Sequence, residues 1–272
     1  PWLPLPAEWA DLSLREVEHA LGVGTPARDG KVFRIVDEGV EEVTRRGGIH
    51  EITEWHTPVG SLRRVMRHSE DLDRLGLPAR IEEYPLKGPA DYRVWEWIWQ
   101  HRRWEPTYDA YRAYDAEIGD DGLPMVSVGD VPLHEFLENG AGYEHAFYHL
   151  SDHEREVGHL LEVMREAERE RMWPVVADSP ARLLLHGQHL STQFTPPRLF
   201  RRYVTPYYQE FAPRMHESGK ALAMHADNDT SVILDLIEEA GWDMVECFVT
   251  APMVPLTLER AREVWGNRVI VW

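Results

Sequence analysis

Cysteine is almost absent from the sequence. Cys247 is the one cysteine among 272 residues, so no disulfide can form within the chain, and such a composition fits a reducing compartment. No apolar run approaches the ~20 residues that a membrane span needs. The first ten residues show no basic stretch followed by an apolar one, as a signal peptide requires. We therefore expect a cytoplasmic protein without a membrane role.

Positive charge is also scarce. The chain has 29 lysine and arginine residues against 47 aspartate and glutamate residues, which gives a formal net charge of -18. Because this charge repels phosphate backbones and anionic lipid surfaces, we expect neither a nucleic-acid partner nor a membrane-surface partner. Hydrophobic residues make up 43% of the chain, which is enough for a sizeable core.

The N-terminal part has the pattern of an antiparallel sheet. Residues 31–37 and 49–55 alternate apolar and polar side chains, as half-buried strands do. Residues 58–67 are placed as a return strand, so that residues 30–68 form a small antiparallel meander. Residues 13–21 are placed as a short helix. We therefore predict that residues 1–88 form an N-terminal helix and β-meander elaboration packed on the rest of the fold.

Residues 89–272 predict an α/β fold. Helices are expected over residues 90–103, 106–118, 133–139, 141–150, 152–171, 197–217, 230–239 and 257–265. Short apolar strands are expected over residues 123–128, 182–186, 220–225, 243–249 and 268–272.

Three glycines recur between these late helices and strands, at Gly219, Gly241 and Gly266. Each stands where a helix takes a left-handed C-cap before the chain turns into a strand. Helix–glycine–strand units of this period indicate parallel strands with right-handed crossovers. Because no glycine-rich phosphate loop follows any strand, a (β/α)8 TIM-type barrel is preferred over a doubly wound open sheet. We expect the barrel to be incomplete in this sequence, with closing strands beyond Trp272.

Polar side chains cluster at the ends of three neighbouring predicted strands. In a barrel the C-terminal strand ends form the active site. One strand ends in His225-Ala226-Asp227-Asn228, the next carries Glu246-Cys247, and an earlier one ends in His186-Gly187-Gln188-His189. His225 and Asp227 are two residues apart, so they project to the same side of an extended chain.

These side chains have more than one interpretation. Imidazole, carboxylate and thiol groups are ligands for zinc or another divalent metal, which would activate a thiol or water nucleophile. Alternatively, His225 and Asp227 are a hydrogen-bonded pair that caps the strand end, with Glu246 solvated and Cys247 a small core residue. A metal-free site would use Asp227 or Glu246 as general acid or base.

Two groups outside these strand ends have structural interpretations as well. The tryptophans of one helical stretch either pack it on the barrel or form a subunit contact, with a ligand stack as the lesser option: Trp95, Trp97, Trp99 and Trp104. Arg63, Arg64 and Arg67 either bind a carboxylate or form an exposed strand face.

The residues from Pro196 to Trp272 resemble the C-terminal half of the uroporphyrinogen decarboxylase superfamily. The matching stretches are PPRLFRRYVTPYYQEFAPRMHESGKALAMHADND, LIEEAGWDMVECF and RVIVW, and the earlier EWHTPVGSLRRV and EEYPLKGPADYRVWEW resemble its methyltransferase-like members. The resemblance implies a (β/α)8 barrel. The superfamily contains porphyrinogen decarboxylases, and zinc methyltransferases that move methyl groups between corrinoids and thiols.

The resemblance also implies site residues. The methyltransferases carry His-x-Cys where this chain has His225-Ala226-Asp227, so Asp227 stands in place of a thiolate and favours a harder metal. Glu246 falls near the place of a glutamate in the related cobalamin-independent methionine synthases. The Arg-Gln-Ala-Gly-Arg segment of the true decarboxylases has no counterpart here, which disfavours that activity.

The first hypothesis is therefore a metal-dependent methyltransferase that acts on a small-molecule substrate, with His225, Asp227 and Glu246 as catalytic residues. The metal ligands would be His225, Asp227, Glu246 and Cys247, and the substrate would be oriented by His186, Gln188, His189 and Asn228. The methyl donor would be a corrinoid, carried by a corrinoid protein, or another methyl compound. The alternatives are a cofactor-independent decarboxylase or lyase, and a catalytically idle barrel that acts as a binding subunit. A homodimer is compatible with each.

Overall fold

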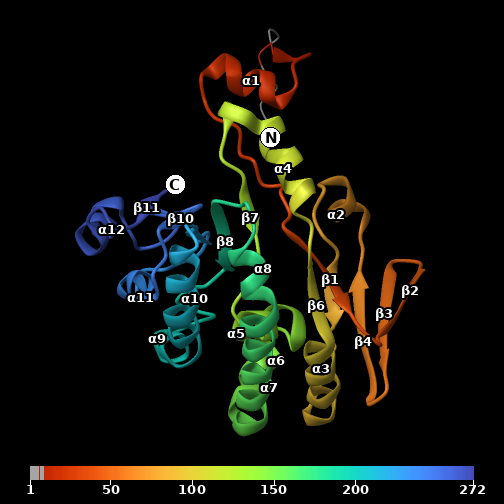
Figure 1. The fold of residues 1–272 in the computed structure, drawn as a ribbon. Helices are drawn as coiled ribbons and strands as arrows, with labels where there is room; N and C mark the ends of the chain where they lie inside the picture. Colours follow the sequence, from red (N-terminus) through yellow and green to blue (C-terminus); the bar gives the residue numbers. More distant parts are fainter. Residues whose placement is uncertain (1–5, 7–8) are drawn as a thin grey trace.

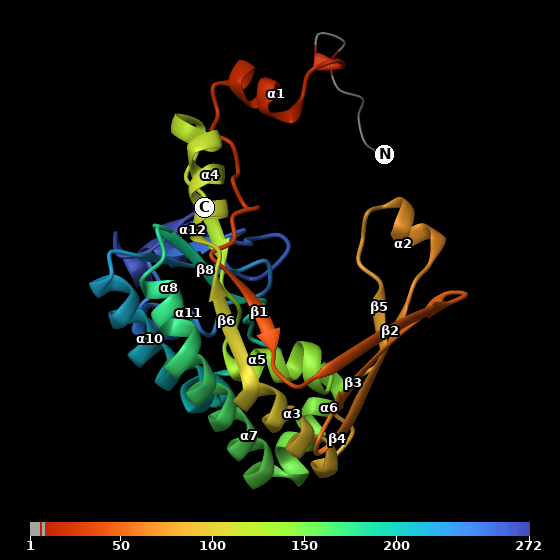
Figure 2. The same ribbon diagram turned by 45° about the vertical axis from the view of Figure 1, so that its right-hand side comes forward.

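The computed structural model describes residue 6 and residues 9–272. The chain is an α/β protein with antiparallel sheets in its N-terminal part and a five-stranded parallel sheet in its C-terminal part. Helices lie between the two, so the four-stranded antiparallel sheet and the parallel sheet are on opposite sides of the molecule (Figures 1 and 2).

The larger antiparallel sheet has the strand order β2–β3–β4–β5. Its strands are β2 (Glu41–Gly47), β3 (His50–Thr57), β4 (Gly60–Arg67) and β5 (Arg80–Glu83). The predicted strands at 49–55 and 58–67 are confirmed as β3 and β4, whereas β2 was not expected. Short helices α1 (Leu14–Leu21) and α2 (Glu70–Arg74) accompany this part of the chain.

The first predicted strand is not part of that sheet. β1 (Phe33–Asp37) pairs with β6 (Arg102–Pro106), with Ile35 opposite Trp104. The prediction of one continuous meander over residues 30–68 is therefore wrong. The physical reason is that β1 has a partner strand from later in the sequence. Arg102 Nε donates to Asp37 Oδ1 at 2.8 Å, and Arg102 Nη2 donates to Asp37 Oδ2 at 2.9 Å. This bidentate ion pair stabilises the register of the two strands.

The middle part of the chain is mainly helical, and its helices lie between the two sheets, except α4, which lies beside α1 (Figures 1 and 2). They are α3 (Pro89–His101), α4 (Tyr108–Ile118), α5 (Pro132–Glu135), α6 (Tyr143–Asp152), α7 (Glu154–Ala167) and α8 (Trp173–Ala177). π-helical turns η3 (Phe136–Gly140) and η4 (Glu168–Met172) follow α5 and α7, and a 3-10 turn η2 (Gly119–Asp121) follows α4. The expected helices over 90–103 and 106–118 are thus confirmed within two residues at each end.

The parallel sheet has the strand order β11–β10–β9–β8–β7. Its strands are β7 (Met125–Ser127), β8 (Leu183–Gln188), β9 (Ala221–His225), β10 (Met244–Glu246) and β11 (Ile270–Val271). The connecting helices are α9 (Pro197–Leu199), α10 (Thr205–Glu217) with the π-helical turn η5 (Phe200–Val204) before it, α11 (Leu234–Ala240) and α12 (Leu258–Trp265). In the described residues β7 and β11 are the two edges of an open sheet, and no barrel closure is present.

Side chains of the parallel sheet alternate between two apolar layers. One face joins the main core under α10 and α11, as Leu184, Leu222 and Val245 do. The other face carries a smaller apolar cluster that includes Leu185 and Ala223. Because alternate residues share a face, His225 continues the second face at its C-terminal end. None of the described helices has the length and apolar character that crossing a membrane requires.

Candidate functional site

The carboxyl ends of β8, β9 and β10 bring the predicted site residues to one edge of the parallel sheet. Glu246 on β10 lies opposite His225 on β9, and Gln188 on β8 lies opposite His225 on the other side. A register shift between Leu185 and Gln188 carries the chain beyond the regular ladder. His189 follows directly, so the ends of three strands converge on the imidazole of His225.

His225 lies between two carboxylates. Its Nδ1 is 2.5 Å from Glu246 Oε2, and its Nε2 is 3.4 Å from Asp227 Oδ2. His189 reaches the same aspartate, with its Nδ1 3.0 Å from Asp227 Oδ1. The two imidazole rings meet edge to face, with their centroids 5.2 Å apart.

Two groups in the described residues have the composition and spacing of a metal site. One is His189, His225 and Asp227, and the other is His225, Glu246 and Cys247; in each group the ligand atoms lie within 4.8 Å of one another. The structure therefore divides the four predicted ligands between two groups. His225 belongs to both, with Nε2 facing Asp227 and Nδ1 facing Glu246.

The ionisation states of the first group suit metal binding. Burial lowers the pKa of His225 by more than the charge of Asp227 raises it, so the net shift is downward. For Asp227, burial alone raises the pKa, but hydrogen bonds and charges from His189 and His225 lower it overall. At neutral pH the site thus holds a neutral imidazole and an ionised carboxylate, the forms that bind metals.

Glu246 has a different environment from Asp227. Its side chain is only 1% exposed, its Oε1 is paired with the guanidinium of Arg28, and Cys247 Sγ donates to that oxygen at 3.0 Å. Arg28 comes from the N-terminal segment that runs beside β7, where Ala27 O accepts from Met125 N at 2.8 Å. The charge of Glu246 is thus balanced within the protein, whereas the carboxylate of Asp227 is 39% exposed.

The backbone is in a rarely used conformation at two of the candidate ligands. In the described chain, the non-glycine residues with positive φ are His189, at 53°, and Cys247, at 54°. A left-handed conformation costs an L-residue roughly 1–2 kcal/mol. Such conformations cluster at functional sites, where the surrounding structure holds them.

A buried polar chain supports the loop after β8. Asp130 Oδ2 accepts from Gln188 N at 2.8 Å and lies 2.9 Å from His134 Nδ1, while His134 Nε2 is 3.1 Å from the Tyr143 hydroxyl. The His134 ring centroid is 6.4 Å from that of His189. Sequence reasoning missed this chain. The available signal was the position of Asp130, two residues beyond the predicted strand 123–128.

Comparison with known proteins gives a similarity of fold. No model of a known protein family matches the chain, and no curated protein matches it in sequence. A solved structure described as a methyltransferase from Methanosarcina mazei is similar to it, with a TM-score of 0.50 and 14% sequence identity. The match covers 95% of this chain and 66% of the other, so this chain spans about two thirds of that methyltransferase. At this identity the likeness shows the fold alone.

The remaining predicted site residues have separate positions. Gln188 Nε2 donates to Ser127 Oγ at 3.1 Å, and Asn228 Nδ2 donates to Asp227 Oδ1 at 2.9 Å, so both border the group. His186 does not face it. Its ring is fully buried against α10, with Nδ1 2.6 Å from the Tyr208 hydroxyl, and burial lowers its pKa to about 4.

Proposed function

We propose that the protein is a metal-dependent methyltransferase of the uroporphyrinogen decarboxylase superfamily. It transfers a methyl group from a corrinoid or another methyl donor to a thiol-type acceptor. The observation that carries this proposal is the convergence of His189, His225 and Asp227 at the carboxyl edge of the parallel sheet. The fold similarity to a methyltransferase supports it, and the parallel sheet would be part of a (β/α)8 barrel.

The metal ligands in this proposal are His189, Nε2 of His225 and Asp227. Two imidazoles and one carboxylate are a ligand set of catalytic zinc, and they leave the fourth position open for water or substrate. When bound there, zinc or another divalent ion would lower the pKa of an acceptor thiol and so supply the nucleophile. The side chains of His189 and Asp227 are 34% and 39% exposed, so an acceptor reaches them from solvent.

Glu246 has an orienting role in this proposal. By accepting the Nδ1 proton of His225, it fixes the tautomer that presents the Nε2 lone pair to the metal. A carboxylate behind a metal-binding histidine is the usual arrangement of such sites. Arg28 in turn pairs with the other oxygen of Glu246, Oε1.

A lyase that needs no metal is the second candidate. The observation that favours it is Arg28, a cation already present beside Glu246 and 41% exposed. A guanidinium in such a position stabilises negative charge that develops on a substrate. Asp227 would then be the polar anchor for the substrate.

The test is metal content, measured by inductively coupled plasma mass spectrometry on protein purified without chelator and then dialysed against zinc. The wild type and the variants His225→Ala, Asp227→Asn and His189→Ala are compared. The matched control is His216→Ala, because His216 Nε2 pairs with Asp243 Oδ2 at 2.9 Å on another part of the surface. We expect one metal per chain in the wild type and the control, and loss of it in the three variants.

A second measurement tests the transfer itself. Methylcobalamin is incubated with the zinc-loaded protein and 2-mercaptoethanol, and demethylation is followed from the corrinoid spectrum. Metal loss in Cys247→Ser, with metal retained in Asp227→Asn, would instead assign the site to His225, Glu246 and Cys247. A wild type that binds no zinc would contradict the metal proposal and leave the lyase.

A further inference from the structure

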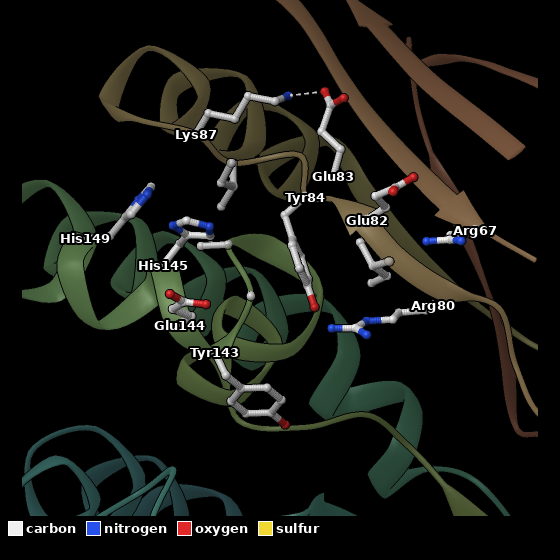
Figure 3. Close-up of a pocket in the computed structure, with 14 residues that line it drawn as sticks. Arg67, Arg80, Glu82, Glu83, Tyr84, Lys87, Tyr143, Glu144, His145 and His149 are labelled. Atoms are coloured by element: carbon white, nitrogen blue, oxygen red, sulfur yellow. Dashed lines mark ion pairs between the residues drawn. The ribbon is translucent and has the colours of Figure 1, made fainter. Parts of the chain in front are cut away.

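A cavity, called the Tyr84 cavity below, lies between the antiparallel sheet and helix α6. Its volume is about 830 Å³. Figure 3 shows Arg67 and Arg80 on its sheet side and Glu144 and His145 on its helix side, with the ring of Tyr84 between them. None of the proposed metal ligands lines this cavity.

Arg67 and Arg80 are directly opposite each other on β4 and β5. Residues in this relation point to the same face of a sheet, and like charges directly opposite each other destabilise it. Among the described residues, neither arginine has a carboxylate within ion-pair distance. Two of the three carboxylates that line the cavity have other partners, since Glu83 pairs with Arg63 and Lys87, and Glu82 pairs with His50 at 2.9 Å. The third, Glu144, stands on the opposite, helix side.

Tyr84 gives the cavity a rigid aromatic wall. A Cβ added at Gly142, whose φ is 78°, would lie 2.5 Å from Tyr84 Cε2, so the ring packs directly on the glycine backbone. The charge of Arg80 acts on the phenol, although burial is the larger influence and the pKa of Tyr84 is raised. The hydroxyl therefore remains protonated and available as a neutral donor beside the guanidinium groups.

We propose that this cavity binds a small organic oxyanion, whose carboxylate or phosphate group is held by Arg67 and Arg80 while its flat or apolar body lies against Tyr84. Guanidinium groups present paired N–H donors that match both kinds of oxyanion. An anion between the two arginines also removes the cross-strand repulsion. In a chain of net charge -18, which repels anions in general, such binding requires a dedicated site.

The cavity also reaches toward the candidate metal centre. Tyr143 lines it and packs against Phe194 with the rings tilted and their centroids 4.2 Å apart, and the Tyr143 hydroxyl is 3.1 Å from His134 Nε2. The inference does not depend on methyl transfer, because the residues that hold the oxyanion are separate from the proposed ligands.

The experiment is isothermal titration calorimetry on chelator-treated, metal-free protein, with benzoate in one arm and inorganic phosphate in the other. We expect saturable binding of at least one probe, weakened at least tenfold in Arg67→Gln and in Arg80→Gln. The matched control is Arg46→Gln, which makes the same charge change on β2, at the other edge of the sheet. Circular dichroism spectra and melting temperatures establish that each variant is folded.

The two probes distinguish the source of the oxyanion. Tighter binding of benzoate assigns a carboxylate with a flat body, and tighter binding of phosphate assigns a phosphate group. The proposal is overturned if neither probe saturates in the millimolar range, or if the two arginine variants bind as tightly as Arg46→Gln. Because metal is removed throughout, a failure here says nothing against the metal centre.

Discussion

Replacing Asp130 by asparagine tests the polar chain that supports the loop after β8. The carboxylate is largely buried and accepts hydrogen bonds from Gln188 N at 2.8 Å and Val131 N at 2.8 Å, and it lies 2.9 Å from His134 Nδ1. Asparagine keeps one oxygen, so at least one donor loses its acceptor and the charge is lost as well. An unsatisfied buried donor costs about 1–3 kcal/mol, and a hydrogen bond between charged groups contributes about 1.5–3 kcal/mol. We therefore expect the free energy of unfolding to fall by roughly 3 kcal/mol.

This loss should depend on pH through His134. Burial alone lowers the pKa of His134, but the charge and hydrogen bond of Asp130, with help from Glu138 and Glu135, raise it overall. A folded-state pKa above the unfolded value means that the stabilisation is complete below the unfolded pKa, about 6.5. It is lost as the pH rises through the folded pKa. Without the Asp130 charge, burial opposes protonation, so the variant's deficit should be larger at pH 5.5 than at pH 9.

Urea denaturation followed by circular dichroism at both pH values measures this difference. The control is Asp109→Asn, because Asp109 is fully exposed and, within the described part of the chain, pairs only with Arg112 one turn away. Such an interaction contributes less than about 0.5 kcal/mol. A loss below about 1 kcal/mol at pH 5.5 would refute the reasoning, because such a loss is smaller than one unsatisfied buried donor. An equal loss at both pH values would refute the assignment to His134.

Three further predictions concern the core, the Tyr84 cavity and the metal centre. Phe211→Ala removes a fully buried ring and should lower the free energy of unfolding by about 3–5 kcal/mol in urea denaturation. Gly142→Ala forces a methyl group into Tyr84 at a φ of 78° and should cost roughly 2 kcal/mol, whereas Gly158→Ala, with open space around it, should stabilise α7 by about 0.5–1 kcal/mol. Glu246→Gln should weaken zinc binding by about 10- to 100-fold in competition with a chelating dye.

Each of these has an outcome that contradicts it. A loss under about 1 kcal/mol in Phe211→Ala would mean that the ring contributes no more than an exposed one. If Gly142→Ala melts at the wild-type temperature, the close packing on Tyr84 is not present in solution. Complete loss of zinc in Glu246→Gln would make Glu246 a ligand.

The fold was predictable where its signals are local. β9, β10 and β11 were expected from helix–glycine–strand units, and Gly219, Gly241 and Gly266 do have positive φ. The register of β1 with β6 was not predictable, because the partner strand lies some 65 residues away in the sequence. The two strands are joined by ion pairs such as that between Asp37 and Arg102, which no local pattern indicates. The helical pattern of 90–103 runs into β6 without an interruption that the sequence marks.

The site was predictable as a set of strand ends, but not in its internal arrangement. The prediction that His186 orients substrate is not supported by its position. It shares the face of Leu184, which the alternation of a strand already indicates, and that face packs on α10. Nothing in the sequence indicated that Arg28 belongs to the site. It is more than 200 residues from Glu246 in the sequence and lies in a segment without a helical or strand pattern.

The two carboxylates beside His225 differ in the interactions that each would lose by binding a metal ion. A cation that took Glu246 as a ligand would compete with Arg28 for the same carboxylate. The displaced guanidinium of Arg28 would then have lost its ion-pair partner, which is unfavourable beside a buried site. Among the described residues, the ion-pair partners of Asp227 are His189 and His225, and Asn228 adds a neutral amide donor. Both histidines become ligands in the proposed centre, so a divalent ion there meets a negative charge that no fixed cation neutralises. The same imidazole then binds the metal through Nε2 and is oriented by Glu246 through Nδ1. This division is why Asp227→Asn should abolish zinc binding whereas Glu246→Gln only weakens it.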